Sequence, residues 1–172
     1  MNEKLKRVKC FLLDMDGTVY LGNRLIDGAI DAVNRMNAFS RAMFLTNNSS
    51  ASRTDYEKKL SKMGFAVTID DIFTSGNATV EYLNSHYAGK KIFLFGNDNL
   101  RDEFEKGCII LEEENPDLAV VGFDTTFDYH RLEKLCDHIR RGVPYITTHA
   151  DINCPKEGGM KPDVGSFIAL IE

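Results

Sequence analysis

The segment CFLLDMDGTVY, residues 10–20, joins a short apolar run to two acidic residues. Residues 8–13 are apolar at all but one position and are too few for a useful helix, so they predict a buried strand. Asp14, Asp16 and then Gly17 follow, and a glycine permits a sharp turn. In an open α/β sheet, ligands bind just beyond the carboxyl ends of the strands. Two carboxylates at such an end could share one Mg²⁺ and one substrate, whereas the plainer interpretation is a polar Asp-Gly turn.

Length and composition indicate an ordinary soluble protein. The 172 residues are 43% apolar and 27% charged, which suits one domain or two small ones. No apolar run approaches the roughly 18 residues of a membrane-spanning helix, and Met1-Asn2-Glu3-Lys4 lacks the core of a signal peptide, so we expect a cytoplasmic protein. The four cysteines lie far apart without a C-x-x-C pair. They predict reduced thiols, with neither a zinc site nor a disulfide framework.

The charge distribution argues against a nucleic-acid partner. Residues 1–88 hold 11 Lys and Arg against 10 Asp and Glu, a net charge of +1, and residues 89–172 hold 10 against 16, a net charge of −6, which together give the −5 of the chain. Neither part shows the basic stripe of a nucleic-acid binder. We therefore expect a small ligand, no nucleic acid and no membrane.

Apolar spacing along the chain predicts alternating strands and helices. Further strands are expected at 42–45, 91–95, 118–121 and 143–147, and helices at 29–39, 53–63, 77–86, 100–106, 129–141 and from 165 into the tail. Such an alternation predicts an α/β fold with parallel sheets.

A second polar group follows the second strand. Thr46 and Asn47 come about 30 residues after the two acids, the length of one strand–helix–strand crossover. Adjacent parallel strands would bring both strand ends to the same edge of the sheet, where a hydroxyl and backbone N–H groups can hold phosphate oxygens. Taken alone, TNNSS at 46–50 is a polar loop. Its combination with DMDGT favours a phosphate site.

These residues resemble a known family. DMDGTVY followed by LTNNS is similar to motifs one and two of the haloacid dehalogenase superfamily of phosphohydrolases. GAIDAVNRM, DDIFTSGNATVEYL and PDLAVVGFDTTFDYHRL resemble one branch in particular, the 4-nitrophenylphosphatase-like enzymes with an α/β cap inserted after motif two. The likeness covers nearly the whole chain. It implies a Rossmann-like parallel-sheet core, incomplete in this chain, in residues 1–88 and an α/β cap domain in residues 89–172.

The resemblance also implies a mechanism. Asp14 would be the nucleophile and form an aspartyl-phosphate, and Asp16 would protonate the leaving alkoxide and then deprotonate the attacking water. Mg²⁺ would bridge the Asp14 carboxylate, the Asp16 backbone carbonyl and the phosphate. Thr46 would hydrogen-bond the transferring phosphoryl group, with Asn47 in its neighbourhood. An acid at Asp16 favours phosphate esters over halides as substrates, because a departing ester oxygen needs a proton and a halide does not.

In this branch a loop of the cap selects the substrate. Residues 147–151, TTHAD, resemble its T-N-x-D loop, with His149 where Asn is usual. The resemblance implies that His149 and Asp151 contact the leaving group, while the alternative is a polar turn at a strand end. The substrate would be a small phosphorylated metabolite such as a sugar phosphate, a nucleoside monophosphate or phosphoglycolate.

Two segments imitate the motifs that such an enzyme still needs, a motif-three Lys and a motif-four pair of acids. GNDNLRD offers Asp98 and Asp102 as motif four, and GMKPD offers Lys161 as motif three. Both fit the cap better, the first as the start of a helix and the second as a Gly/Pro-rich turn. Without further core strands, residues 8–13 would form an exposed apolar edge, which folded proteins avoid. We therefore expect an N-terminal part of a longer phosphatase, inactive or weak alone, whose remaining motifs follow this chain or are absent.

Two other classes of function remain open. One is a non-catalytic phosphate-binding or phospho-accepting module, as in the receiver domains of signalling systems, although an acid two residues after the acceptor and TNN downstream argue against it. The other is a degenerate family member that serves as an interaction protein. A homodimer is compatible with the sequence.

Overall fold

The computed structural model describes residues 5–172, and Met1–Lys4, the segment considered for a signal peptide, lies outside the described residues. The described residues form two compact units by their contacts. The first unit holds the described part of Met1–Thr46 with Arg53–Phe73 and Pro155–Met160, and the second holds Asn47–Ser52, Thr74–Cys154 and Lys161–Glu172.

The predicted division into domains, 1–88 and 89–172, stays a prediction. The contacts group the helix α3, Ser75–His86, with the second unit because it packs on the helix α4, Asp98–Lys106.

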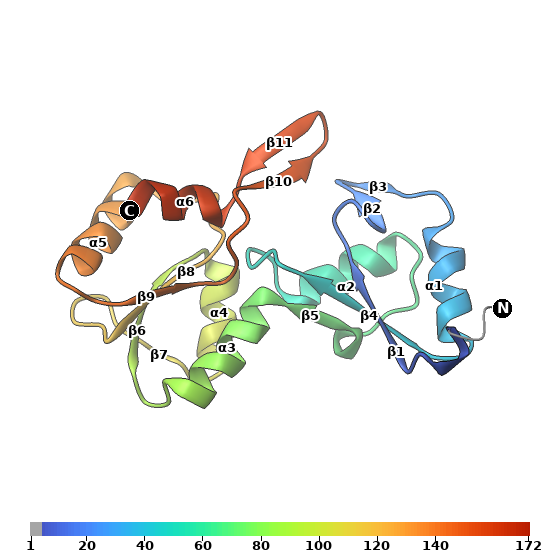
Figure 1. Ribbon diagram of the computed structural model, residues 1–172, viewed down its shortest axis with the longest axis horizontal. Helices are drawn as coiled ribbons and strands as arrows, with labels where there is room; N and C mark the ends of the chain where they lie inside the picture. The colour runs from blue at the N-terminus through green and yellow to red at the C-terminus, as the bar shows by residue number, and fades with distance from the viewer. Residues whose placement is uncertain (1–4) are drawn as a thin grey trace. The chain divides into compact units, whose positions relative to one another are not determined.

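The first unit is built on a small sheet with the strand order β1-β4-β5 (Figure 1). β1 and β4 are parallel, with Cys10 opposite Arg41 and Asp14 opposite Leu45. The elements are β1 Cys10–Asp14, β2 Tyr20–Leu21, β3 Arg24–Leu25, α1 Ala29–Asn37, β4 Arg41–Thr46, α2 Arg53–Lys62 and β5 Ile72–Thr74, with short 3-10 turns at Leu5–Arg7 and Ile69–Asp71.

Burial in the first unit falls on alternate residues of β4. Ala42 and Phe44 are buried, and the Phe44 ring meets the edge of the Phe65 ring with centroids 5.5 Å apart. β1 is the outermost of the three described strands of this sheet, and Leu12 on it is 65% exposed. The prediction of a buried first strand is therefore wrong for β1, because an edge strand has a neighbour on one side and can leave one face in solvent.

The second unit contains a parallel sheet with the strand order β7-β6-β8-β9. Its elements are α3 Ser75–His86, β6 Lys91–Phe95, α4 Asp98–Lys106, β7 Ile110–Leu111, β8 Leu118–Val121, α5 Tyr129–Arg140, β9 Tyr145–Thr147 and α6 Val164–Ile171. A separate two-stranded sheet of β10 Asn153–Lys156 and β11 Gly159–Pro162 contains the residues Pro155–Met160 that are grouped with the first unit.

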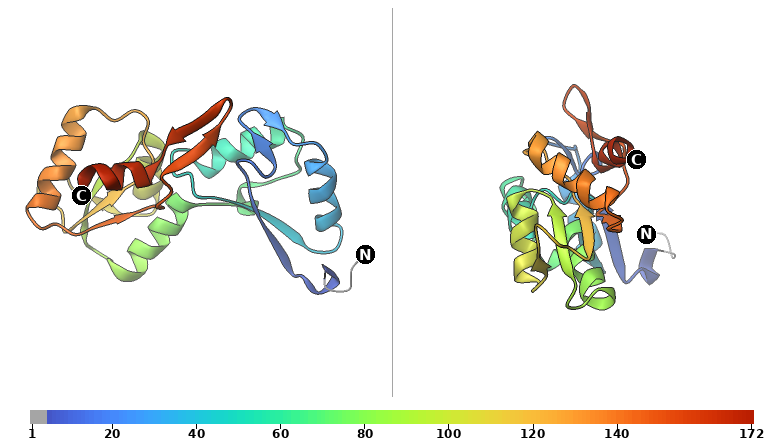
Figure 2. Two further views of the ribbon diagram at one scale, coloured as in Figure 1. Left: turned by 45° about the horizontal axis from the view of Figure 1, so that its top comes forward. Right: turned by 90° about the vertical axis from the view of Figure 1, so that its left-hand side faces the viewer.

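Helices cover both faces of this sheet, which explains its continuous apolar strands. Successive residues of a strand point to opposite faces. Ile92 and Leu94 of β6 pack with side chains of α3 and α4, whereas Phe93 and Phe95 pack with side chains of α5 and α6. The ribbon of Figure 2 shows helices on both sides of this sheet. The central strand β8 is buried along its whole length.

Each of the four described helices of the second unit begins at a capping side chain, as helix starts commonly do. Thr74 Oγ1 accepts from Asn77 N at 3.1 Å, and Asn97 Oδ1 accepts from Leu100 N at 3.1 Å. The corresponding caps of α5 and α6 are Asp128 and Asp163.

The structure gives the local conformation of the two segments that imitate motifs four and three. GNDNLRD is the start of α4, as predicted for the cap, and both of its acids are exposed on that helix. GMKP forms β11, so the predicted turn is in fact the second strand of a hairpin whose chain reverses at 157–158. Lys161 on β11 holds its Nζ 4.8 Å from the centroid of the Phe123 ring.

None of the helices in the described part of the chain has both the length and the apolar character needed to cross a bilayer.

Candidate functional site

The structure places the first acid and the threonine predicted to bind phosphate at the same end of the first unit's sheet. Asp14 is the last residue of β1 and pairs with Leu45, and Thr46 is the next residue on the parallel neighbour β4. Asp14 is exposed and Thr46 is 7% exposed. This is the juxtaposition that parallel strands produce at their carboxyl ends.

Each of the two acids is held by a hydroxyl group four residues further along the chain. Thr18 Oγ1 donates to Asp14 Oδ2 at 3.1 Å, and Tyr20 Oη donates to Asp16 Oδ2 at 3.2 Å. The other Asp14 oxygen, Oδ1, accepts no hydrogen bond from the described residues, so it remains available for chemistry.

A tight turn brings residues that are four positions apart close together. Gly17 N donates to Tyr20 O at 2.7 Å and Val19 N donates to Met15 O at 3.0 Å. Gly17 has a φ of 88°, a left-handed conformation that glycine adopts without a steric penalty. The turn therefore returns the chain so that the side chain of Tyr20 reaches Asp16.

Tyr20 is enclosed by the first unit. Its exposed fraction is 0%, and Lys59 Nζ lies 3.6 Å from the centroid of its ring. Burial raises the pKa of the Tyr20 hydroxyl, and the negative charge of Asp16 raises it further. The hydroxyl therefore stays protonated and serves as a donor.

The two acids fit a hard divalent cation. Mg²⁺ prefers oxygen ligands, and it usually binds through one or two carboxylates together with waters and substrate phosphates. Asp14 offers a carboxylate oxygen free of hydrogen bonds from the described residues, and Asp16 lies two residues away beyond the strand end. The donor set suits Mg²⁺, although the role of these residues as ligands stays a prediction.

The loop that follows β4 belongs to the second unit. Asn47, which the sequence assigns to the phosphate site, donates from Nδ2 to Asp151 Oδ2, and its backbone oxygen accepts from Ser75 Oγ at 2.6 Å. Ser49 is 1% exposed and its Oγ accepts from Phe123 N at 2.8 Å. The TNNSS segment is thus anchored by its own polar side chains.

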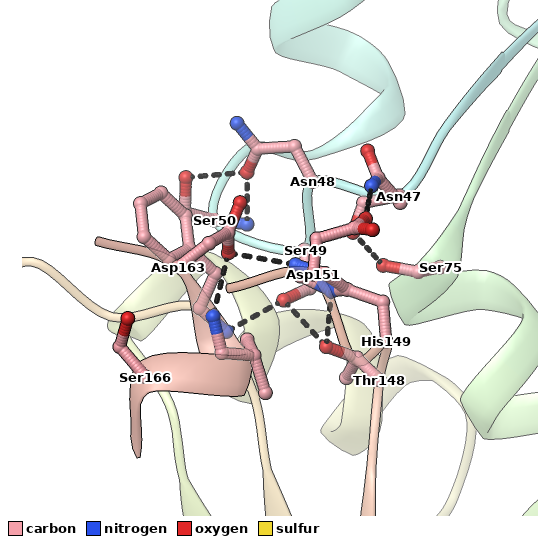
Figure 3. A network of polar contacts seen from close by, with 12 residues as sticks. Asn47, Asn48, Ser49, Ser50, Ser75, Thr148, His149, Asp151, Asp163 and Ser166 are labelled. Carbon is pink, nitrogen blue, oxygen red and sulfur yellow. Dashed lines mark hydrogen bonds and ion pairs between the residues drawn. The ribbon is translucent and has the colours of Figure 1, made fainter. Parts of the chain in front are cut away.

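A chain of hydrogen bonds leads from Ser49 to His149 (Figure 3). Ser49 Oγ lies 3.1 Å from Thr148 Oγ1, which in turn lies 3.1 Å from His149 Nδ1. His149 Nε2 lies 2.7 Å from Asp163 Oδ1. An ionised carboxylate only accepts, so Nε2 carries the proton that His149 donates to Asp163.

His149 therefore faces inward, in contrast to Asp151. The side chains of His149 and Asp163 are 7% and 4% exposed, and both imidazole nitrogens have partners within the second unit. Asp151 is exposed. Asp151 is thus exposed and His149 is buried against Asp163, and the part of both residues in substrate selection stays a prediction.

The same loop is fastened to the first turn of α6. Gly165 N donates to Asp151 O at 2.8 Å, and Ser166 Oγ donates to Ile152 O at 2.7 Å. A Cβ at Gly165 would lie 2.5 Å from the backbone oxygen of Ala150, closer than packed atoms tolerate. A glycine is needed here so that the loop backbone can approach the helix.

Burial raises the pKa of the Asp163 carboxyl, but hydrogen bonds from His149, Cys154 and Val164 outweigh burial and hold that pKa below its ordinary value. Asp163 is therefore ionised at neutral pH. It caps α6 and accepts from His149 with the same oxygen.

Sequence reasoning did not assign roles to Thr18, Tyr20 or Asp163. For the first two, the available signal was a hydroxyl four residues after each acid. For Asp163, the signal was an acidic residue directly before the apolar run VGSFIALI, which is typical of a helix N-cap.

Comparisons with known proteins agree on one family. Haloacid dehalogenase-like hydrolases match residues 11–108, which is more than half of the chain. Among curated proteins, the acid sugar phosphatase of Staphylococcus saprophyticus is 31% identical over 169 residues, which cover 97% of this chain and 65% of that protein.

Solved structures give the same result over almost the whole chain. A 4-nitrophenylphosphatase from Thermotoga maritima has a TM-score of 0.94 and 42% identity, covering 99% of this chain and 66% of that one. A glycerol phosphate phosphatase from Mycobacterium tuberculosis in complex with magnesium has a TM-score of 0.90 and 28% identity, covering 99% of this chain and 53% of that one. The chain spans about 65% of the length of the curated relatives that it matches.

Proposed function

The chain belongs to the family of haloacid dehalogenase-like hydrolases, and on that premise we propose that the protein carrying it is a Mg²⁺-dependent hydrolase of phosphate monoesters. The observation that supports this most directly is the position of Asp14 beside Thr46 at the carboxyl ends of two parallel strands. Relatives named acid sugar phosphatase, 4-nitrophenylphosphatase and glycerol phosphate phosphatase support it further.

In the proposed reaction, the available oxygen of Asp14 attacks phosphorus. The bond from phosphorus to the ester oxygen breaks, and an aspartyl-phosphate forms. Asp16 gives its proton to the departing ester oxygen. Water then attacks the aspartyl-phosphate, Asp16 takes the water's proton, and inorganic phosphate leaves, which restores both carboxyl groups.

Thr46 and Asn47 are the proposed phosphate-binding residues, and Asp14 with the backbone carbonyl of Asp16 are the proposed ligands of Mg²⁺. A bound Mg²⁺ supplies positive charge between the Asp14 carboxylate and the phosphate, which otherwise repel each other. Thr46 contributes a hydroxyl donor to the transferring phosphoryl group. Asn47 lies in the neighbourhood of that group, and its side-chain amide donates to Asp151.

The substrate in this proposal is a small phosphorylated metabolite, of the sugar phosphate, nucleoside monophosphate or phosphoglycolate type. Asp151 and His149 supply the specificity. Asp151 does so with an exposed carboxylate, and His149 acts through its buried contact with Asp163, which keeps the loop in place.

The experiment that tests the proposal is hydrolysis of 4-nitrophenyl phosphate by the protein that carries this chain. Activity should be lost in EDTA, return with added Mg²⁺, and be lost in Asp14→Asn. Asp137→Asn is a matched control, because it makes the same change at an exposed helix position. Phosphate binding without turnover would instead support a non-catalytic phosphate-binding module, and binding of neither phosphate nor Mg²⁺ would support a degenerate interaction protein.

A further inference from the structure

We propose that Tyr20 is a positioning residue for Asp16, and that its hydroxyl fixes the orientation of the carboxyl group that exchanges a proton with the leaving group. The inference rests on the proposed function, in which Asp16 is the acid and base. It gives a role to Tyr20, for which the sequence analysis proposed none.

The contact between the two side chains is direct. Tyr20 Oη donates to Asp16 Oδ2 at 3.2 Å. The backbones of the same two residues form a β-bridge, and Gly17 N donates to Tyr20 O at 2.7 Å. Backbone and side-chain contacts therefore both join the two ends of the turn, so a shift of Tyr20 would also move Asp16.

The ring of Tyr20 is also held by a contact with α2. It is 0% exposed, and Lys59 of α2 places its ammonium group 3.6 Å from the ring centroid, within the range of a cation–π contact. A closely packed ring keeps its hydroxyl at one place. By contrast, Thr18 holds Asp14 from an exposed position.

Orientation of the acid matters most when the leaving group is a poor one. An alkyl alkoxide must receive a proton as it departs, whereas 4-nitrophenolate is stable as an anion and departs without one. A general acid that is held in the wrong orientation therefore slows the cleavage of alkyl esters selectively.

The test compares Tyr20→Phe with the unchanged protein on two substrates, glycerol phosphate and 4-nitrophenyl phosphate. The measured quantity is kcat/KM, which reports the steps up to departure of the leaving group. General acid catalysis contributes about 10²- to 10⁴-fold, so loss of its positioning should lower kcat/KM about tenfold for glycerol phosphate. For 4-nitrophenyl phosphate, the loss should be smaller than about twofold because little proton transfer is needed.

Tyr145→Phe is the matched control. Its hydroxyl donates to Glu172 Oε1 at 2.7 Å, a hydrogen bond of the same kind in the second unit. This variant should leave both kcat/KM values unchanged. A loss in Tyr20→Phe that is equal for the two esters would overturn the proposal, since a purely structural role does not distinguish leaving groups.

A second measurement separates this inference from the proposed function. If the unchanged protein hydrolyses neither ester, the proposed function fails. The contact between Tyr20 and Asp16 is then tested by thermal unfolding of Tyr20→Phe, Asp16→Asn and the double variant. A contact between the side chains predicts that the double variant loses less in Tm than the sum of the two single losses. Additive losses would show that Tyr20 does not hold Asp16, and the inference would be withdrawn.

Discussion

His149 Nε2 lies 2.7 Å from Asp163 Oδ1, and both side chains are almost completely enclosed. The carboxylate that accepts from this imidazole also caps α6, and the backbone of the loop carrying His149 is bonded to the first turn of the same helix. One buried pair therefore ties together the loop proposed to select the substrate and the helix that supports it.

Because of this pair, we expect part of the pH dependence of the free energy of unfolding to disappear in Asp163→Asn. The folded-state pKa of Asp163 is below its ordinary value, so its contribution to stability is present above the unfolded pKa and is lost as the pH falls through the folded one. We expect Asp163→Asn to be less stable by about 1 kcal/mol at neutral pH. The difference should persist down to about pH 5 and shrink below about pH 4.

Urea unfolding between pH 7 and pH 3 measures this difference. Asp137→Asn is the control, because its carboxylate is 60% exposed and pairs with Arg140 in solvent. The prediction would be contradicted if the difference in free energy of unfolding between Asp163→Asn and the unchanged chain became larger towards low pH.

Gly165→Ala should destabilise the second unit. Alanine is normally better than glycine inside a helix by about 1 kcal/mol. Here the added Cβ would lie 2.5 Å from Ala150 O and 2.8 Å from the carbonyl carbon of Asp151, and overpacking of this kind costs about 1–3 kcal/mol. Chemical denaturation should therefore show a loss. The control Ala169→Gly, at an exposed position of α6, measures the difference in helix propensity alone. A higher free energy of unfolding in Gly165→Ala would mean that the loop backbone does not contact the helix closely.

Local pattern predicted most of the fold. The strands at 91–95 and 118–121 and the helix starting at Tyr129 have the predicted bounds or nearly so, because uniform apolar runs and regular helical spacing carry their own signal. The likeness to a 4-nitrophenylphosphatase confirms the branch of the family that the sequence resembles. Short pairings such as β2 with β3, and β10 with β11, were not predicted as strands, because two to four residues of mixed polarity have no period to read.

The candidate site was predicted less completely. Motif spacing brought Asp14 and Thr46 to one sheet end, as the register of β1 and β4 shows. The inward orientation of His149 was not predictable, because it depends on Asp163, a partner 14 residues away that only the folded chain brings within reach.

Asp124 and Arg131 should be among the most sensitive positions of the second unit. Asp124 is 0% exposed, and Arg131 donates to its Oδ2 at 2.8 Å. Asp124→Ala removes a buried carboxylate and leaves donors of Thr126 and of the 32% exposed Arg131 without their acceptor, so it should cost about 1–3 kcal/mol. Asp137→Ala breaks an exposed pair with Arg140 and should cost less than about 1 kcal/mol. Guanidinium unfolding distinguishes the two, and similar losses would argue against the buried pair.

Leu12 should govern self-association of the 172-residue chain. It is 65% exposed on β1, the outermost described strand of its sheet. An apolar edge strand offers unpaired backbone groups together with an apolar side chain, and both favour strand-to-strand pairing with another copy. Leu12→Lys should therefore lower the associated fraction in sedimentation velocity at high concentration.

The free energy of unfolding of Leu12→Lys should change by less than about 0.5 kcal/mol, since the position is exposed. Leu60→Ala, at a fully buried position, should instead cost about 2–5 kcal/mol and leave the edge intact. Association that is equally strong in Leu12→Lys would place the contact on another surface.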